Sequence, residues 1–256
     1  TVECKSKQIR SDNSKTRNVF KVNESVGPTG RSLRYCNSGE KLNMIQLQPL
    51  FPNAIGFESA PDLVTYDLVN DVKSLSQGQN THNRVSIENR ILTTDQNEFK
   101  TKHSQLVKFL EDSLENFYYH ALGVPFEDGN IKSVITQSWF TYSVKGESMH
   151  GHKHPNSIVS GVFYINAKNE DQIIFTKQHE YKNLEWYAKE RNEYTGKEFI
   201  VPVKTGDLIL FNSNQHHHFN DIEHDEERIS LAFNSWLGGE FGTKDALTHL
   251  VSNNTY

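Results

Sequence analysis

The sequence contains few cysteines and no long apolar run. Only two cysteines, Cys4 and Cys36, occur among 256 residues, too few for the disulfide framework of a small secreted protein. No segment approaches the roughly 20 consecutive apolar residues that span a bilayer, and the first residues contain no apolar stretch typical of a signal peptide. We therefore expect an intracellular, cytoplasmic protein with free thiols and no membrane partner. If a phage encodes it, we expect it in the host cytoplasm or the virion.

The sequence also lacks an excess of basic residues. The formal net charge is −5 and the sequence pI is about 6.2, which makes nucleic acid an unlikely partner. The charge is unevenly placed, because residues 1–43 carry +5 and the remainder carries −10. This basic N-terminal arm either lies solvated against its own acidic body or docks an acidic protein partner or a sister subunit.

The pattern of a folded domain covers residues 44–256. A strand is predicted for residues 44–51. Two amphipathic helical patterns follow within about 60–122, and the longer one covers 98–122. These two helices are expected to brace the core of the domain.

Short β-prone runs separated by turn signals dominate the rest of the chain, within about 131–237. They cover residues 131–143, 157–166, 171–176, 198–203, 207–212, 215–220 and 227–237. Such a series predicts a β-sandwich or barrel, covered by the preceding helices on one face. The expected fold class is therefore mainly β (α+β). Residues 177–197 form a polar and aromatic insertion between strands, of a length typical of functional loops.

Histidine is concentrated in two short segments. The two groups are His150, His152 and His154, and His216, His217 and His218. Neutral imidazole is the commonest protein ligand of first-row metals. In an extended segment His152 and His154 project to the same side because side chains alternate with period 2. The two groups together predict a metal site rather than surface histidines.

The residues around these histidines resemble a known enzyme family. The stretch 143–154 reads S-x-x-G-x-x-M-x-x-H-x-H, similar to the Y-x-x-G-x-x-Y/F-x-x-H-x-D signature of prolyl-hydroxylase-type 2-oxoglutarate- and iron(II)-dependent dioxygenases. The sequences H-P-N-S at 154–157 and S-G-V-F-Y at 160–164 resemble a bacterial and phage branch with an H-x-H-P-x-S…S-G-V-Y-Y pattern. G-D-L-I-L-F at 206–211 and R-I-S-L-A-F-N at 228–234 follow in the family's order. The resemblance covers roughly residues 44–237 and implies a double-stranded β-helix, or jelly roll.

The resemblance also implies roles for individual residues. The implied iron(II) ligands are His152, His154 and His217. The implied 2-oxoglutarate ligands are Arg228, Ser230 and Tyr164, and a planar guanidinium can bind a carboxylate through two charge-assisted hydrogen bonds. Further candidates for the pocket are Asn156, Trp139 and Asn234, although for Trp139 a place in the core is favoured over a role as a substrate platform.

Three positions depart from the family pattern. His154 stands where the family has a carboxylate, Ser143 replaces a tyrosine, and Met149 replaces an aromatic residue. Three neutral histidines leave the metal more positive by one unit, which changes its redox tuning, and zinc, nickel or manganese would also fit them.

The implied activity is an oxygenase that uses O2, decarboxylates 2-oxoglutarate to succinate and hydroxylates an unknown substrate. The alternative is a non-catalytic metal-binding assembly module on the same fold, docked through the basic arm.

Overall fold

The computed structural model describes residues 48–75, 84–85, 91–92, 98–127, 129–177, 192 and 194–253. The predicted basic arm 1–43 and most of the insertion 177–197 lie outside these residues. The described residues belong to one compact unit, Gln46–Tyr256. None of the helices in this described part is long and apolar enough to cross a membrane.

Both predicted helical patterns are observed. A 3-10 turn at Pro61–Leu63 leads into α1 (Tyr66–Ser74), where the side chain of Thr65 accepts a hydrogen bond from the backbone N–H of Leu68 at 3.2 Å. Such a cap satisfies one of the free N–H groups of the first turn.

The longer predicted helix is interrupted at one residue. It consists of α2 (Glu98–Lys102) and α3 (Ser104–Leu122), separated at His103. Gly123 ends α3 in the left-handed conformation, with φ of 68°, which a residue without Cβ adopts at little cost.

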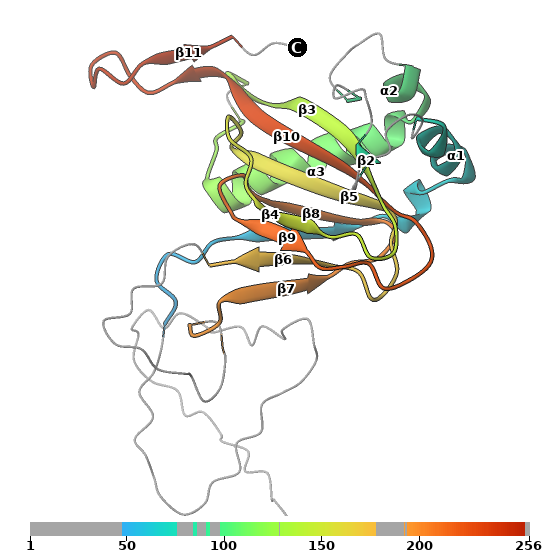
Figure 1. The fold of residues 1–256 in the computed structure, drawn as a ribbon. Helices are drawn as coiled ribbons and strands as arrows, with labels where there is room; N and C mark the ends of the chain where they lie inside the picture. Colours follow the sequence, from blue (N-terminus) through green and yellow to red (C-terminus); the bar gives the residue numbers. More distant parts are fainter. Residues whose placement is uncertain are drawn as a thin grey trace, which may run out of the picture. The chain divides into compact units, whose positions relative to one another are not determined.

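The strands form two antiparallel sheets (Figure 1). The larger sheet has the order β1-β8-β5-β10-β3-β2, with β11 paired to β10. Its strands are Ile55–Ser59 (β1), Arg84–Val85 (β2), Ile131–Ser143 (β3), Val159–Asn166 (β5), Asp207–Asn212 (β8), Arg228–Phe241 (β10) and Leu250–Ser252 (β11). The smaller sheet has the order β4-β9-β6-β7. Its strands are Met149–His152 (β4), Gln172–Thr176 (β6), Glu198–Pro202 (β7) and His217–Phe219 (β9).

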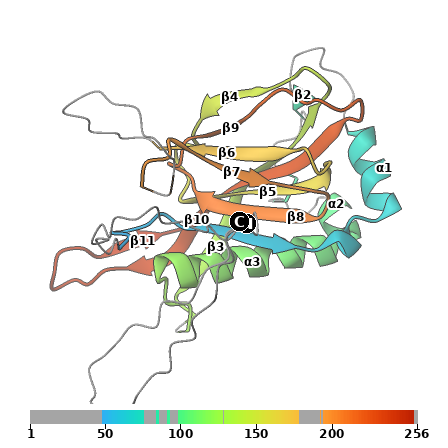
Figure 2. The same ribbon diagram turned by 90° about the horizontal axis from the view of Figure 1, so that it is seen from below.

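The connections from β3 to β10 produce a jelly roll. Strands β6 and β7 pair as a hairpin, whereas every other pair of consecutive strands from β3 to β10 lies in different sheets. This alternation closes a double-stranded β-helix and confirms the predicted fold class. Figure 2 shows the resulting layers, with α3 on one face of the larger sheet and the smaller sheet on the other.

Three strand predictions need correction. Residues 48–51 are not a strand, because Pro49 and Pro52 lack the N–H groups that a sheet ladder uses. The strand in this region is β1. Strand β4 was not predicted, because its four residues are too short to show alternation. Strand β10 continues past residue 237 to Phe241, where its last residues pair with β11.

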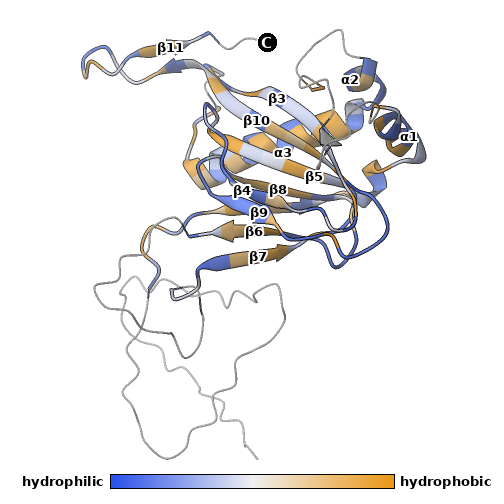
Figure 3. Ribbon diagram, in the orientation of Figure 1, coloured by the Kyte–Doolittle hydropathy of each residue, from blue (hydrophilic) through white to orange (hydrophobic). Residues whose placement is uncertain are grey.

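Side-chain alternation divides the core into two layers. Phe163 and Leu208 belong to a cluster between the larger sheet and the helices, whereas their neighbours Tyr164 and Ile209 belong to a cluster between the two sheets. Figure 3 shows hydrophobic and hydrophilic residues alternating along α3, and it shows β4 and β9 as more hydrophilic than β6. The buried apolar residues of α3 belong to the cluster on the helical side of the larger sheet. In the space between the sheets, polar side chains of β4 and β9 therefore lie next to the apolar inter-sheet cluster.

The helical layer gives a stability prediction. Leu110 of α3 is fully buried, whereas Leu122 at the end of the same helix is 42% exposed. We expect Leu110→Ala to lower the free energy of unfolding by about 3 kcal/mol, because it removes buried methyl groups and leaves a cavity. The matched control Leu122→Ala should cost less than about 1 kcal/mol. Urea unfolding followed by circular dichroism measures both, and equal losses would contradict the layer assignment.

Candidate metal centre

Three histidines converge between β4 and β9. One ring nitrogen from each of His152, His154 and His217 lies within 4.8 Å of the others. The ring centroids of His152 and His217 are 4.4 Å apart, and that of His154 is 5.0 Å from the first and 5.1 Å from the second. Within the described part of the chain, this is the group of histidine, cysteine or acidic side chains with the geometry to hold a metal ion.

Strand pairing brings two of these histidines together. His152 on β4 is the register partner of His217 on β9. Gly151 allows this close approach, because a Cβ there would lie 2.1 Å from the imidazole of His216. His154 lies beyond the end of β4, and its backbone N–H donates to the carbonyl of Ser213 at 2.9 Å. The predicted grouping of these three histidines is therefore present in the structure.

All three imidazoles are held in the form that binds metals. Burial lowers the pKa of His217 to about 3, and burial and the neighbouring His152 lower the pKa of His154 to about 4. Burial likewise lowers the pKa of His152. The three rings are therefore neutral at pH 7, because protonation would place like charges together in a poorly hydrated space.

Hydrogen bonds to backbone carbonyls select the tautomer of two ligands. Nδ1 of His152 lies 2.9 Å from the carbonyl oxygen of His150, and Nδ1 of His217 lies 3.0 Å from that of Gln215. Since a carbonyl only accepts, Nδ1 carries the proton in both rings and Nε2 keeps a free lone pair. This arrangement is typical of metal-binding histidines.

A buried arginine and tyrosine lie in the same inter-sheet layer. Arg228 is 4% exposed and Tyr164 is fully buried, and the Cζ atom of Arg228 lies 5.1 Å from the Tyr164 ring centroid. Arg228 also packs 4.0 Å above the ring of Phe219, which projects from β9 on the same side as His217. The arginine and the histidines therefore face the same inter-sheet space.

Two buried polar atoms of Arg228 and Tyr164 lack a hydrogen-bond partner among the described residues. Among the residues that the structure describes, nothing hydrogen-bonds the hydroxyl of Tyr164 or Nε of Arg228, although both atoms are buried. Burial raises the pKa of Tyr164, and the positive charge of Arg228 opposes this. An unsatisfied buried polar group costs roughly 1–3 kcal/mol, so a ligand with oxygen acceptors would stabilise this place.

Ser230 completes the predicted group. It lies on β10 directly opposite Tyr164 on β5 and Thr141 on β3, and it is 7% exposed. The Arg228, Ser230 and Tyr164 positions are therefore contiguous in the sheet.

The predicted pocket residues have different environments. Trp139 is half-buried, with its ring 5.7 Å from that of His154, so it lies beside the histidines rather than in the deep core. Asn234 is buried, accepts from Ser160 at 2.8 Å and donates to Gln137 at 3.1 Å. Asn156 is exposed in a turn with φ of 58°, and no contact places it at the histidines.

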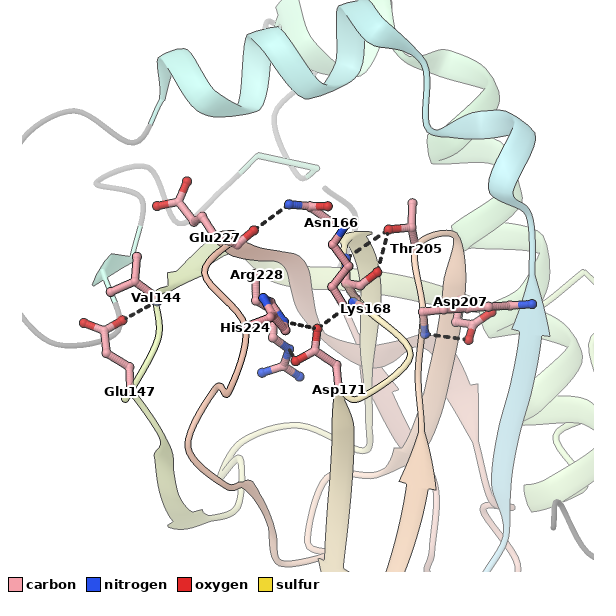
Figure 4. Close-up of polar contacts among 12 residues, drawn as sticks. Val144, Glu147, Asn166, Lys168, Asp171, Thr205, Asp207, His224, Glu227 and Arg228 are labelled. Atoms are coloured by element: carbon pink, nitrogen blue, oxygen red, sulfur yellow. Dashed lines mark hydrogen bonds and ion pairs between the residues drawn. The ribbon is translucent and has the colours of Figure 1, made fainter.

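Two residues beside Arg228 were not predicted from the sequence. Oδ1 of Asp171 lies 3.8 Å from Nε of Arg228, and Oδ2 accepts from Nε2 of His224 at 3.1 Å and from the backbone N–H of Lys168 at 2.8 Å. Figure 4 shows Asp171 between His224 and Lys168, with Arg228 beside it. No sequence motif marks this group, because Asp171 and Arg228 are 57 positions apart.

Comparison with known families gives one match over part of the chain. Residues 137–234 match the model of the family described as "Putative 2OG-Fe(II) oxygenase". The matched segment contains the three histidines, Tyr164, Arg228 and Ser230. The match confirms the similarity to 2-oxoglutarate- and iron(II)-dependent oxygenases that the motifs predicted. A comparison with curated proteins gives no match.

Solved structures give further similarities at low sequence identity. An oxidoreductase of the 2OG-Fe(II) oxygenase family from Burkholderia pseudomallei is 12% identical over 71% of this chain and 83% of its own, with a TM-score of 0.46. A Pseudomonas putida prolyl-4-hydroxylase is 17% identical over 71% and 92%, with a TM-score of 0.45. HygX from Streptomyces hygroscopicus, with nickel and 2-oxoglutarate bound, is 13% identical over 75% and 85%, with a TM-score of 0.48.

The lowered histidine pKa values predict how the metal-free protein responds to pH. Below the ordinary pKa of 6.5, the unfolded chain takes up protons that the folded protein excludes from His217 and His154. The free energy of unfolding should therefore fall as the pH falls from 7 towards 4. We expect His217→Gln to reduce this loss by about 2 kcal/mol.

Urea unfolding of chelator-treated protein at pH 7 and at pH 4.5 measures the effect. The matched control is His150→Gln, because His150 is an exposed histidine on the neighbouring strand β4, and the pH response of this variant should equal that of the wild type. An unchanged response in His217→Gln would count against the burial of a neutral His217.

Proposed function

We propose that this protein is a 2-oxoglutarate- and iron(II)-dependent dioxygenase that hydroxylates its substrate. The single observation that supports this most strongly is the juxtaposition of three neutral, converging imidazoles with a buried Arg228, whose Nε has no hydrogen-bond partner among the described residues. Both groups face the space between the two sheets. In this proposal His152, His154 and His217 hold the metal. Arg228, Ser230 and Tyr164 hold 2-oxoglutarate.

The donor set fits a divalent first-row metal. His152, His154 and His217 would hold the metal through three imidazole nitrogens, a donor set that differs from that of non-haem iron oxygenases by one histidine in place of a carboxylate. The third histidine leaves the metal with one more unit of positive charge, which favours an anionic second ligand. A chelating keto acid would supply the negative charge.

The buried polar atoms fit the far end of a dicarboxylate. A guanidinium binds a carboxylate by charge-assisted hydrogen bonds, and the unpaired hydroxyl of Tyr164 can donate to the same group. Ser230, opposite Tyr164 on the neighbouring strand, supplies a further hydroxyl on this face.

The protein's own contribution is to position the co-substrate and to exclude water. When bound, iron(II) and 2-oxoglutarate together supply the oxidising chemistry, in which 2-oxoglutarate loses carbon dioxide to give succinate. Phe175 and Phe211 pack against His217, at 6.2 Å and 4.6 Å between ring centroids, and form an apolar wall on that side. We expect a substrate to approach from the side of Trp139, which is half-buried beside His154.

Two further expectations stay predictions. One is the intracellular location, which rests on the low cysteine content of the sequence. The other is the docking of the basic arm to an acidic protein or a sister subunit, and the arm lies outside the described part of the chain. The alternative of a non-catalytic assembly module rests on His154, which stands where the family has a carboxylate. Titration with metal and 2-oxoglutarate, followed by oxygen, distinguishes such a module from an enzyme.

The proposal predicts that metal and co-substrate binding can be separated by mutation. Anaerobic titration with iron(II) and then 2-oxoglutarate should produce a visible metal-to-ligand charge-transfer band. We expect His217→Ala to lower metal affinity at least tenfold. Arg228→Ala should keep the metal and weaken 2-oxoglutarate binding about 100-fold, because it removes a charge-assisted hydrogen-bonding partner.

A matched control and an oxygen step complete the test. Lys153→Ala removes an exposed cation between two of the histidines and should leave both affinities unchanged. Succinate formed after oxygen is admitted would support the enzyme, and a bound metal with neither band nor succinate would favour the assembly module. Unchanged 2-oxoglutarate affinity in Arg228→Ala would reject the role given to this residue.

A further inference from the structure

Two of the three tryptophans of the sequence lie on strands β3 and β10 without joining the apolar core. Trp139 and Trp236 are half-buried, and neither belongs to the cluster on the helical side of the larger sheet or to the cluster between the sheets. An indole carries a large apolar surface, which a folded protein normally buries in its core. Two such rings outside the core therefore indicate a surface that a ligand can cover.

Strand register places both tryptophans on the face where the metal centre lies. Trp139 is the register partner of Ala232 on β10, and its ring centroid lies 5.7 Å from that of His154. Ala232 and Trp236 project to the same face, because side chains alternate along a strand and Phe233 between them belongs to the helical cluster. Four residues of a strand span about 13 Å. The two tryptophans therefore mark the ends of a surface that begins beside a metal ligand.

This surface is built by side chains of two paired strands. We call it the tryptophan track; it contains Ala232, Asn234 and Trp236 of β10 and their register partners Trp139, Gln137 and Val134 of β3. Beyond Ser235, β10 continues past the end of β5 but stays paired with β3 (Figure 1). Backbone N–H and C=O groups of paired strands bond to the neighbouring strand in the plane of the sheet. A ligand on the track therefore meets side chains, and this face does not favour the addition of a peptide strand.

Two buried groups fix the amide of Gln137 in the middle of the track. The hydroxyl of Ser160 donates to Oδ1 of Asn234 at 2.8 Å, and Nδ2 of Asn234 donates to Oε1 of Gln137 at 3.1 Å. Ser160 and Asn234 are buried, whereas Gln137 is exposed. Because Oε1 of Gln137 accepts in this contact, its two N–H groups are left to donate to oxygen atoms of a ligand.

The six residues of the tryptophan track carry no charge. The next register pair along the two strands, Lys132 and Gly238, contributes one exposed cation. A nucleic acid needs several Lys or Arg contacts to its phosphates, and one lysine does not supply them. An uncharged ligand with flat apolar surfaces and oxygen acceptors between them fits the track best.

We propose that the tryptophan track binds the substrate and that this substrate is a neutral oligosaccharide; the assignment rests on the function proposed above. One side of a pyranose ring is a flat array of C–H groups that can pack on an indole. The edge of the ring carries hydroxyl groups that accept hydrogen bonds from an amide such as that of Gln137. A single sugar is shorter than the track, whereas a chain of sugars contacts both indoles at once. The unit that covers Trp139 then lies beside His154, where the proposed oxidation takes place.

Calorimetry on the nickel-loaded full-length protein with 2-oxoglutarate measures saccharide binding without turnover. The probes are cellohexaose, maltohexaose and chitohexaose, each compared with its monosaccharide. We expect at least one hexasaccharide to bind about tenfold more tightly than its monosaccharide, because only a chain reaches both indoles. Trp236→Ala should weaken hexasaccharide binding about tenfold and should leave monosaccharide binding at Trp139 unchanged. Trp236→Tyr should restore most of the lost affinity, because it returns an aromatic ring to this position.

The matched control is Tyr66→Ala, because Tyr66 is an aromatic residue of α1 that is 81% exposed, and this variant should bind like the wild type. Gln137→Ala separates the amide from the stacking rings and should weaken hexasaccharide binding about fivefold. No binding of any hexasaccharide, or equal binding by Trp236→Ala and the wild type, would overturn the proposal. Tighter binding of an oligoproline peptide or of single-stranded RNA than of every hexasaccharide would also overturn it.

Two further measurements keep the outcomes separate. If Trp236→Ala does not fold, Gln137→Ala decides in its place. A wild type that binds a hexasaccharide but gives no charge-transfer band with iron(II) and 2-oxoglutarate would reject the proposed function and not the binding surface. A band without any saccharide binding would reject the binding surface and leave the proposed function standing.

Discussion

The candidate centre depends on one close strand contact, the pairing of His152 on β4 with His217 on β9. Both strands are short and polar, so they contribute little apolar surface of their own, and their approach is made possible by Gly151 under the ring of His216. The larger sheet and α3 supply most of the buried apolar residues. The larger of the two apolar clusters therefore lies in the helical layer, whereas the histidines share the inter-sheet layer with the smaller one.

The same separation explains how charged groups are tolerated between the sheets. Arg228 and Asp171 are both buried, and removing either partner of such a pair is far more costly than never having formed it. The rings of Phe219 and Tyr164 flank the guanidinium, so the arginine is desolvated on those sides and its attraction for an anion is strengthened. The pair thus keeps the positive charge of Arg228 in a poorly hydrated place with a carboxylate beside it.

The parts of the structure that repeat with a period were predictable from the sequence, and those that depend on contacts between distant segments were not. Strand β3 and the apolar face of α3 follow from alternation and from i, i+3, i+4 spacing. The resemblance assigned Tyr164 and Ser230 to one site, and the sheet pairs these two positions directly. Strand β4 is too short for a pattern. The Asp171–His224 contact joins loops 53 positions apart, and in the sequence His224 is one residue in an acidic run. No local rule distinguishes its partner from the other carboxylates.

His154 raises a separate structural problem, because it lies beyond β4 and no strand pairing holds it. Its N–H is bound by the carbonyl of Ser213, whose hydroxyl contacts those of Ser157 and Ser160 at 2.7 Å and 2.8 Å. Ser157 in turn contacts the backbone of Ser235, and the hydroxyl of Ser235 lies 3.0 Å from that of Tyr118 on α3. A buried network in which each hydroxyl has a partner is rigid, since any displaced member leaves an unpaired polar group. The helix that braces the sheet is therefore connected through these hydroxyl contacts to the segment whose carbonyl binds the N–H of His154.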